Sequence, residues 1–293
     1  MKRSSSRGPL VSIVTPSLNA ERFLDATINS VLVQDYPDIE YVVMDGGSAD
    51  GSLEILRRYE GRLRYVSEPD AGQADAINRG FALTSGEILA FLNADDAYFP
   101  GAVATAVRAF AARPDAGVIY GDAVYVDERG AEVGPYPVES FDRFKLERRC
   151  FICQPAAFFR RDAFVASGGL DTSLRFALDY DLWIRMARRY PMVKIDTRLA
   201  TLRLHDRAKT VSETEQALHE TIVVLQRHFG YVPFNWLYGY GHHRLTRQPI
   251  AVEKPRPALS SALFAAALGS RYNWRHPLRY GRDIVSTARR GLA

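Results

Sequence analysis

Short acidic segments recur along this chain directly after apolar runs, and this repeated pairing is the feature that most restricts its fold. Each apolar run is four to six residues long and is typical of a buried strand. Ligands of open α/β sheets gather just beyond the carboxyl ends of the strands, so we expect these acids to surround one site. They are Asp45, Glu68, Asp70, Asp95 and Asp96, and a later acid, Asp179, opens an expected helix.

The first 120 residues alternate between strand and helix patterns that are joined by short loops. The expected strands are Leu10–Thr15, Ile39–Met44, Leu63–Val66, Ile88–Leu92 and Val118–Tyr120. The expected helices are Glu21–Gln34, Leu53–Arg58, Gln73–Leu83 and Pro100–Ala112. Such alternation predicts an α/β fold with a mostly parallel, doubly wound sheet flanked by helices.

The pattern changes after Gly121 to short aromatic-rich segments, which we expect to be built onto the same sheet. The expected strand segments are 123–126, 155–159, 193–195 and 201–204, and the expected helices are 179–189 and 213–229. We therefore divide the chain into three parts. They are a flexible tail (1–8), an α/β domain (9–210, with halves 9–120 and 121–210) and a helical, basic C-terminal extension (211–293).

The formal net charge of +4 conceals an uneven distribution of charge. Residues 240–293 hold ten lysines and arginines against two acidic residues, so the rest of the chain is net acidic. A duplex-binding protein is expected to carry its positive charge on the folded surface that reads the duplex, so we expect no nucleic acid partner. The basic extension is either solvated or forms a patch for the anionic headgroups of a membrane surface.

The apolar residues are spread along the chain, and no run of about 18 occurs that predicts a membrane-spanning helix. The segment Leu259–Leu268 is apolar but only ten residues long, and its basic flanks favour an interfacial helix. The basic N-terminus is not followed by the long apolar region of a secretory signal. We therefore expect a cytoplasmic protein, with peripheral attachment to the inner face of the membrane left open.

Seven motifs follow one another in an order that is specific even though each motif alone is weak. They are Thr15-Pro-Ser-Leu-Asn19, Asp45-Gly-Gly-Ser-Ala-Asp-Gly-Ser52, Glu68-Pro-Asp-Ala-Gly-Gln-Ala-Asp-Ala-Ile-Asn-Arg-Gly80, Leu92-Asn-Ala-Asp-Asp96, Gln154-Pro155, Gly168-Gly-Leu-Asp171 and Asp179-Tyr-Asp-Leu-Trp-Ile-Arg185. Over roughly residues 9–210 the chain resembles the family 2 glycosyltransferases of the GT-A fold. The resemblance implies a Rossmann-like sheet and an inverting enzyme that moves a sugar from a nucleoside diphosphate sugar. Residues 9–120 would then bind this donor, and residues 121–210 the acceptor.

A diphosphate leaving group develops negative charge that an oxygen-ligated Mg²⁺ or Mn²⁺ neutralises well. We expect Asp96 to be a ligand of this cation, and its neighbour Asp95 to contact the ribose or assist the metal. The family's Asp-x-Asp pattern falls here on Asn93-Ala94-Asp95, which leaves open which acid is the ligand. His205 resembles a histidine that some members use as a further metal or diphosphate contact, although lone histidines are more often structural.

The resemblance also assigns donor-binding roles along the first half of the chain. Asp45 corresponds to the acid that reads the base, and a carboxylate can accept an N–H of uracil. Gly47 permits a tight turn, whereas Ser48 either caps the next helix or contacts the donor. The remaining expected donor contacts are Thr15, Pro16, Asn19, Asp75, Asn93 and Gln154.

Asp179 is the expected general base. Inversion in one displacement requires a single carboxylate that deprotonates the acceptor hydroxyl as it attacks. Asp181 is the rival, but two residues along a helix turn a side chain by about 200°, so only one of the two can face the site. We expect Asp181 to cap the helix or to pair with Arg185. Leu178 departs from the Glu-Asp pair that the family often carries here.

Two other classes of function compete with sugar transfer. A sugar-nucleotide nucleotidylyltransferase shares the α/β layout, but it normally carries a glycine-rich basic loop after the first strand, which Thr15–Asn19 lacks. A non-catalytic nucleotide-binding or glycan-binding protein of the membrane surface would keep the donor residues without turnover. The favoured function is transfer from a UDP-sugar to a glycan or lipid-linked acceptor in polysaccharide biosynthesis.

Overall fold

The computed structural model describes residues 8–246 and 259–289, which form two compact units. The first unit holds 8–141, 151–173 and 185–204, and the second holds 142–150, 174–184 and the described residues from 205 onward. The predicted division of the chain at residue 210 differs from these units. Two internal segments, 142–150 and 174–184, pack with the C-terminal helices and so belong to the second unit.

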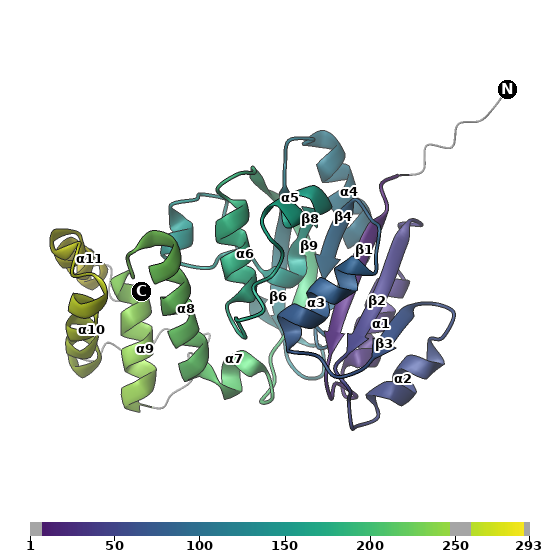
Figure 1. The fold of residues 1–293 in the computed structure, drawn as a ribbon, viewed down its shortest axis with the longest axis horizontal. Helices are drawn as coiled ribbons and strands as arrows, with labels where there is room; N and C mark the ends of the chain where they lie inside the picture. Colours follow the sequence, from purple (N-terminus) through teal and green to yellow (C-terminus); the bar gives the residue numbers. More distant parts are fainter. Residues whose placement is uncertain (1–7, 247–258, 290–293) are drawn as a thin grey trace. The chain divides into compact units, whose positions relative to one another are not determined.

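The first unit is built on one mixed sheet, which has nine strands within the described residues. Its order is β3-β2-β1-β4-β8-β6-β9-β5, and β7 pairs with β6 (Figure 1). The strands are β1 Val11–Ser17, β2 Ile39–Asp45, β3 Arg64–Ser67, β4 Ile88–Phe91, β5 Ala97–Tyr98, β6 Val118–Val126, β7 Glu132–Pro135, β8 Ala157–Arg160 and β9 Met192–Arg203. The first four strands pair in parallel as predicted, whereas β5, β7 and β8 pair antiparallel to their neighbours.

The register of the parallel strands places their carboxyl ends side by side. Ser17 at the end of β1 pairs with Asp45 at the end of β2, which in turn pairs with Ser67 at the end of β3. The loops that follow these strands therefore begin at the same edge of the sheet. This alignment brings the predicted donor-binding segments together.

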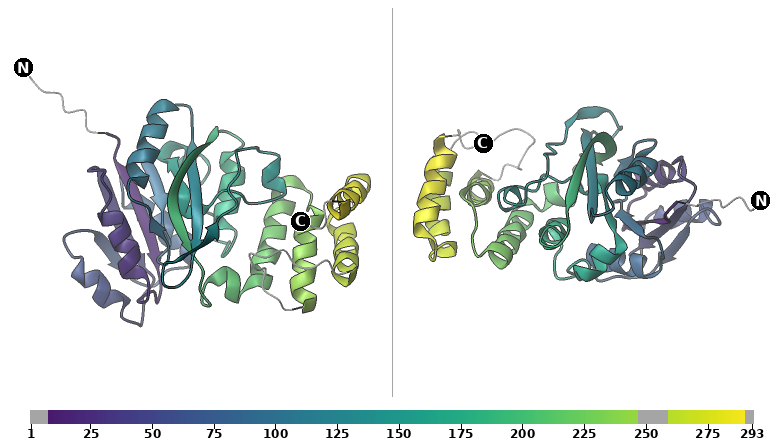
Figure 2. Two further views of the ribbon diagram at one scale, coloured as in Figure 1. Left: turned by 180° about the vertical axis from the view of Figure 1, so that it is seen from behind. Right: turned by 90° about the horizontal axis from the view of Figure 1, so that it is seen from above.

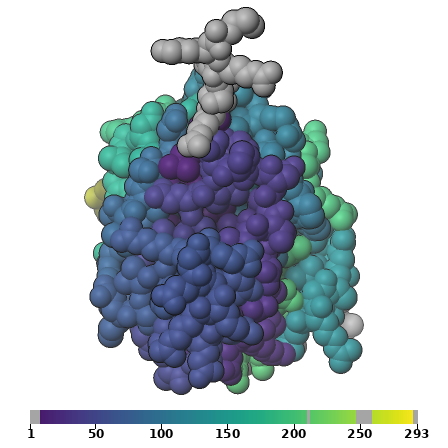
Figure 3. Space-filling view, turned by 90° about the vertical axis from the view of Figure 1, so that its right-hand side faces the viewer, coloured from purple at the N-terminus to yellow at the C-terminus, as the bar shows by residue number. Residues whose placement is uncertain are grey.

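Helices cover both faces of the sheet (Figures 1 and 2). They are α1 Leu24–Leu32, α2 Ser52–Arg58, α3 Gln73–Ala82, α4 Ala102–Ala112 and α5 Arg161–Ala166. The apolar residues of α1, α2 and α4 form one core with Val11, Ile13 and Val43 of the strands. The helix α3 lies on the opposite face, where Gly80 approaches Val14. In Figure 3, which looks from the side of the edge strand β3, the purple and blue residues of this unit form a continuous surface.

The strand β9 corrects one prediction, because it is a single strand where the sequence pattern indicated two. It runs parallel to β6 on both sides of a register shift near Asp122. The residues between the two predicted segments, 196–198, are exposed on the strand, so they lack the apolar pattern by which a buried strand is recognised. The continuous strand ends at Arg203, beside the loop that follows β4.

The second unit is helical. Its helices are most of α6 (Leu178–Met186), α7 Lys209–Ser212, α8 Thr214–Phe229, α9 Phe234–Thr246, α10 Leu259–Tyr272 and α11 Pro277–Arg289. The expected helix 213–229 corresponds to α8, and the apolar segment from Leu259 continues as α10 to Tyr272. Gly241 of α9 packs against Phe264 of α10, and Gly269 of α10 packs against Tyr280 of α11.

A buried carboxylate anchors α11 to the rest of this unit. Asp283 is 3% exposed, and its oxygens accept hydrogen bonds from Arg148, the Tyr231 hydroxyl and the Phe234 backbone N–H. The basic extension is therefore folded over its described part. In the described ranges, no helix is long and apolar enough to cross a membrane.

The substitution Gly80→Ala tests the packing of α3 on the sheet. An added Cβ would lie 2.6 Å from Cγ1 of Val14 and 3.0 Å from Cγ of Met44, so we expect overpacking to lower the free energy of unfolding by about 1–3 kcal/mol. Gly281→Ala is the matched control, because that helical position has open space and alanine should add up to about 1 kcal/mol. Urea denaturation followed by circular dichroism measures the free energy of unfolding of both variants and of the parent. A Gly80→Ala variant as stable as the Gly281→Ala variant would contradict the close packing of α3.

Candidate functional site

Polar loops follow all four parallel strands at one edge of the sheet. The strand order changes direction at β1, which lies between β2 and β4. In open α/β sheets ligands bind at such a switch point, beyond the carboxyl ends of the strands. The ends of β1, β2 and β4 and the loops that follow them carry the residues from Thr15 to Asn19, Asp45 to Ser48, and Asn93 to Asp96. The predicted donor residues of the first half therefore meet at the expected edge.

Asp45 organises the loops after β1, β2 and β3. Its side chain is 2% exposed, and its carboxylate accepts hydrogen bonds from the Ser48 hydroxyl, the Ser48 backbone N–H and the Ser67 hydroxyl. The Ser48 hydroxyl also accepts the backbone N–H of Asn19 at 2.7 Å. The carboxylate, which has about four acceptor sites, therefore already uses three of them to hold the loops.

The loop after β1 turns at Asn19, which has a φ of 50°. Asparagine tolerates this left-handed conformation, and its Oδ1 accepts the backbone N–H of Ala49 at 2.8 Å. Pro16 pairs in register with Met44 of β2. Thr15 is fully buried, with its hydroxyl 3.0 Å from that of Tyr41, so its side chain belongs to the core beneath the loop.

The glycines after β2 allow two close approaches. Gly47 has a φ of 82°, a conformation that favours glycine. An added Cβ at Gly46 would lie 2.7 Å from Oδ2 of Asp70, in the segment after β3. Asp75 lies in the first turn of α3, where its Oδ2 accepts the Ala71 backbone N–H and lies 3.6 Å from the Arg79 guanidinium.

Three side-chain amides form a cluster behind the acidic pair. Asn93 accepts a hydrogen bond from Nε2 of Gln73 at 2.7 Å and donates to Oε1 of Gln154 and Oδ2 of Asp96, both at 3.3 Å. Gln154 donates to the Phe91 carbonyl of β4 and is 8% exposed. Asn93 and Gln154 thus lie together, and Gln73 of α3 completes their hydrogen bonds.

The two neighbouring acids have different surroundings. Asp96 is 2% exposed, and its oxygens accept the Arg203 backbone N–H at 3.0 Å and the Asn93 amide at 3.3 Å. Burial, and secondarily the charge of Asp95, raises the pKa of the Asp96 carboxyl well above its usual range. Asp95 is only partly buried. Asp95 is therefore the more accessible carboxylate of the pair.

Arg203 holds the loop that carries both acids. Its Nε donates to the Asp95 carbonyl at 2.9 Å, and its Nη1 donates to the carbonyls of Asp127 and Glu128 at 3.0 Å. Its guanidinium also lies 4.8 Å from the centre of the Phe23 ring. Arg203 therefore ties the end of β9 to the loop after β4.

The residues around the acids fit a cation that arrives with a diphosphate better than a resident one. Within the described residues, no group of three histidine, cysteine or acidic side chains is arranged to hold a metal ion. Both oxygens of Asp96 accept protein hydrogen bonds, whereas the Asp95 carboxylate is partly exposed. Mg²⁺ is commonly bound by one or two carboxylates together with substrate phosphates, which this arrangement can satisfy.

Asp179 lies in the second unit, at the second residue of α6. Burial raises the pKa of the Asp179 carboxyl to about 6, and the Tyr180 backbone N–H, which donates to its Oδ1 at 2.8 Å, partly offsets this rise. A carboxyl with this pKa is ionised at neutral pH and can accept a proton. The environment of Asp179 thus has the electrostatic property that a general base requires.

The start of α6 is fixed by two residues of α8. Glu220 accepts the backbone N–H groups of Arg175, Phe176 and Ala177 at 2.6 to 2.9 Å. Asp181 is 1% exposed, with Oδ1 2.6 Å from Nε2 of His228. Arg185 donates to the Ser167 carbonyl, and its expected pairing with Asp181 stays a prediction.

His205 lies just beyond β9, at the beginning of the second unit's C-terminal segment. Its carbonyl accepts the backbone N–H of Ala208 at 3.1 Å. Its predicted role as a metal or diphosphate contact stays a prediction.

Sequence reasoning missed three residues that support these groups: Gln73, Glu220 and His228. Each acts through a contact that spans at least 20 residues in sequence. Gln73 lies inside the Asp-x-Gly-Gln motif, which is a signal that could have identified it. Glu220 and His228 lie on α8 outside the seven motifs, and only the packing of that helix on α6 identifies them.

Comparison with known proteins defines the class of this chain. A family model described as Glycosyl transferase family 2 matches residues 12–167. A PGL/p-HBAD biosynthesis glycosyltransferase of Mycobacterium tuberculosis is 33% identical over 182 residues, covering 60% of this chain and 69% of that protein. An uncharacterized glycosyltransferase of Rickettsia typhi is 26% identical over 233 residues, covering 74% and 71% of the two chains.

Solved structures show the same fold. TarS of S. aureus (residues 1–349), in complex with UDP-GlcNAc, superposes with a TM-score of 0.62 at 15% identity, covering 92% of this chain and 82% of that one. The mannosyltransferase PcManGT of Pyrobaculum calidifontis, in complex with GDP-Man and Mn²⁺, gives a TM-score of 0.58 at 18% identity, covering 96% and 87%. The GT-A fold prediction is confirmed. The chain belongs to glycosyl transferase family 2 and is a glycosyltransferase.

The substitution Arg203→Lys tests the clamp on the acidic loop. Lysine cannot reproduce the three guanidinium hydrogen bonds to backbone carbonyls, so we expect the free energy of unfolding to fall by about 2 kcal/mol or more. Arg198→Lys is the control on the same strand, because its exposed ion pair with Glu132 contributes less than about 1 kcal/mol. Chemical denaturation measures the free energy of unfolding of both variants. Equal losses of stability would show that the Arg203 hydrogen bonds contribute no more than an exposed ion pair.

Proposed function

We propose that this glycosyltransferase is an inverting enzyme that transfers a hexosyl group from a nucleoside diphosphate sugar, with a UDP-sugar favoured. The acceptor is a hydroxyl of a glycan or lipid-linked molecule in polysaccharide biosynthesis. The observation that carries the proposal is the partly buried carboxyl of Asp179 at the fixed start of α6, whose pKa is raised by desolvation to about 6.

Asp179 acts as the general base in a single displacement. The acceptor oxygen forms a bond to C1 of the sugar while the bond from C1 to the diphosphate oxygen breaks. The acceptor proton passes to Asp179, and the bonding electrons leave with the nucleoside diphosphate. Attack from the face opposite the leaving group inverts C1 and requires no covalent enzyme intermediate. Asp181 does not compete for this role, because it is buried against His228.

The donor half of the proposal is supported by the loops after β1, β2 and β4. Asp45 retains one of its acceptor sites for an N–H of uracil, and the loop of Gly47 and Ser48 brings backbone groups close to it. Asn19, Asp75 and Gln154 hold these loops in place through hydrogen bonds to backbone groups. TarS in complex with UDP-GlcNAc shares the fold, which makes a UDP-sugar the first donor to test.

A divalent cation, Mg²⁺ or Mn²⁺, would neutralise the charge of the leaving diphosphate when it is bound. The accessibility of Asp95 supports this residue as the ligand, in place of Asp96 as first expected. Asp96 then holds the loop through Arg203 and Asn93. His205 remains a candidate for a further contact to the metal or the diphosphate.

A lipid-linked acceptor would be presented at a membrane surface. The proposal therefore includes a cytoplasmic location with peripheral association at the inner face of the membrane. The exposed arginines of the C-terminal helices support this part, because anionic headgroups attract such side chains.

The substitution Asp179→Asn tests the assignment of the base. Asparagine cannot accept the acceptor proton, so we expect transfer to fall by about 10² to 10⁴-fold while donor binding is retained. Because the carboxyl's folded-state pKa is raised, ionisation near pH 7 disfavours folding, and the variant should be at least as stable as the parent. Asp115→Asn, at an exposed acid, is the control. Normal transfer by the Asp179 variant would refute the assignment.

The pH dependence of the parent enzyme gives a second measure of the same group. The base is active when ionised, so the turnover rate should rise as the pH increases through about 6 and then level off. The rate should be lost as the pH falls below this value, because the protonated carboxyl cannot accept a proton. A turnover rate that does not change between about pH 5 and pH 7 would contradict the role of Asp179 as the base.

Calorimetric titration with UDP, GDP and dTDP, each with and without Mn²⁺, tests the donor and the metal. We expect one nucleotide to bind in a metal-dependent manner, and Asp95→Asn to weaken that binding by roughly tenfold or more. Asp96→Asn should instead leave the metal dependence in place, because the Asp96 oxygens contact Arg203 and Asn93. Unchanged metal dependence in the Asp95 variant would remove this residue from the site.

A further inference from the structure

The exposed face of α11 carries alternating apolar and cationic side chains. Leu278, Arg282, Val285 and Arg289 follow one another at spacings of four, three and four residues, which places them on one face of a helix. The opposite face carries the buried residues Tyr280, Asp283 and Thr287. The helix therefore has one buried face and one exposed face, and the exposed face carries both apolar and basic side chains.

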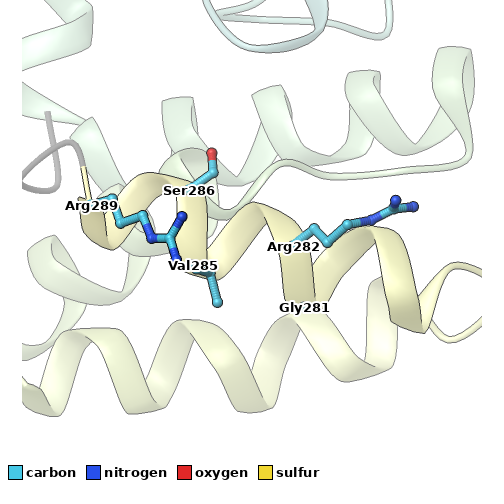
Figure 4. A pocket seen from close by; sticks show the side chains of 5 residues that line it. All are labelled: Gly281, Arg282, Val285, Ser286 and Arg289. Carbon is cyan, nitrogen blue, oxygen red and sulfur yellow. The ribbon is translucent and has the colours of Figure 1, made fainter.

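Large apolar side chains are exposed on and just before this helix. Leu278 is 81% exposed, and Trp274, in the turn before α11, is 68% exposed with the Arg275 guanidinium 4.9 Å from its ring centre. Gly281, Arg282, Val285, Ser286 and Arg289 line a shallow hollow on α11 (Figure 4). Figure 4 shows the side chains of Arg282, Val285 and Arg289 along α11, whose buried residues are Tyr280, Asp283 and Thr287.

The charge of this surface is uniformly positive. Residues 259–289 contain five arginines and one acid, Asp283, which is buried and bound to Arg148. Arg279 pairs with Glu147. Among the residues that the structure describes, Arg271, Arg275, Arg282 and Arg289 form no salt bridge. Four cationic groups thus lie in the same segment, 271–289, as the exposed tryptophan and leucine.

We propose that this surface, defined by Trp274, Leu278, Arg282, Val285 and Arg289, docks on an anionic lipid bilayer. Arginines on an interfacial helix bind headgroups while tryptophan and leucine enter the boundary between headgroups and acyl chains. A nucleic acid backbone would attract the arginines but would not bury the exposed leucine and valine. An anionic bilayer can bind the arginines at its headgroups and bury the apolar side chains. This proposal rests on the peripheral membrane association proposed above and names the surface that would provide it. The surface includes no residue of the donor site.

Sedimentation of the full chain with lipid vesicles tests the proposal. We compare vesicles of phosphatidylcholine alone with vesicles that contain about 30% phosphatidylglycerol, at roughly 0.1 M salt. We expect binding to the anionic vesicles, with weakening as salt is raised. The double variant Arg282→Gln, Arg289→Gln should bind about 30-fold more weakly, at about 1 kcal/mol per arginine.

Two further variants make the result specific to this surface. Arg57→Gln combined with Arg108→Gln removes the same charge from exposed helical positions of the first unit and should leave lipid binding unchanged. Trp274→Ala combined with Leu278→Ala should weaken binding to anionic vesicles even at low salt, because it removes the inserted groups. Circular dichroism and nucleotide titration of each variant establish that the fold and the donor site are intact.

Three outcomes would overturn the proposal. The first is that the chain binds its nucleotide but does not bind anionic vesicles. In that case the membrane proposal fails while the donor-binding proposal stands. The second is an equal loss of binding in the control variant, which would indicate attraction by net charge alone. The third is a dimer in light scattering that the Trp274 and Leu278 substitutions convert to a monomer while lipid binding persists, which would assign the surface to a second copy of the chain.

Discussion

The attachment of Arg203 to the loop after β4 is the interaction on which the acidic site depends. Its backbone N–H fixes the carboxylate of Asp96, and its guanidinium fixes the carbonyl of Asp95 and two carbonyls after β6. These contacts join the parallel half of the sheet to its last long strand. The guanidinium of Arg203 donates only to backbone carbonyls, and the Asp95 carboxylate is partly exposed.

Other buried acids also hold parts of the structure together through the hydrogen bonds that they accept. Desolvating a carboxylate is costly unless donors compensate it. Asp45 is compensated by two serines, Asp181 by His228 and Asp283 by Arg148, Tyr231 and a backbone N–H. In each case at least one compensating donor comes from another segment, so the acid joins elements that are distant in sequence. Asp179 differs, since its Oδ1 accepts the backbone N–H of its own neighbour Tyr180 and burial raises the pKa of its carboxyl.

Much of the first unit could be predicted because each strand and helix there has a local apolar period and a short loop. The meeting of the loops after β1, β2 and β4 followed from the same argument. The different roles of Asp95 and Asp96 could not be predicted, since the two are adjacent and only a contact with Arg203, 107 residues later, distinguishes them. The helices α9 and α11 were missed because glycines, histidines and arginines interrupt their apolar pattern.

The helix that bears Asp179 has its N-terminus capped from outside the matched family region. Glu220 of α8 satisfies three backbone N–H groups there, whereas the family model ends at residue 167. Grafting the first 210 residues onto a different C-terminal segment would leave those groups without their acceptor. The C-terminal helices therefore complete the start of α6, and a chimera that exchanges C-terminal segments should keep α6 and α8 from the same parent.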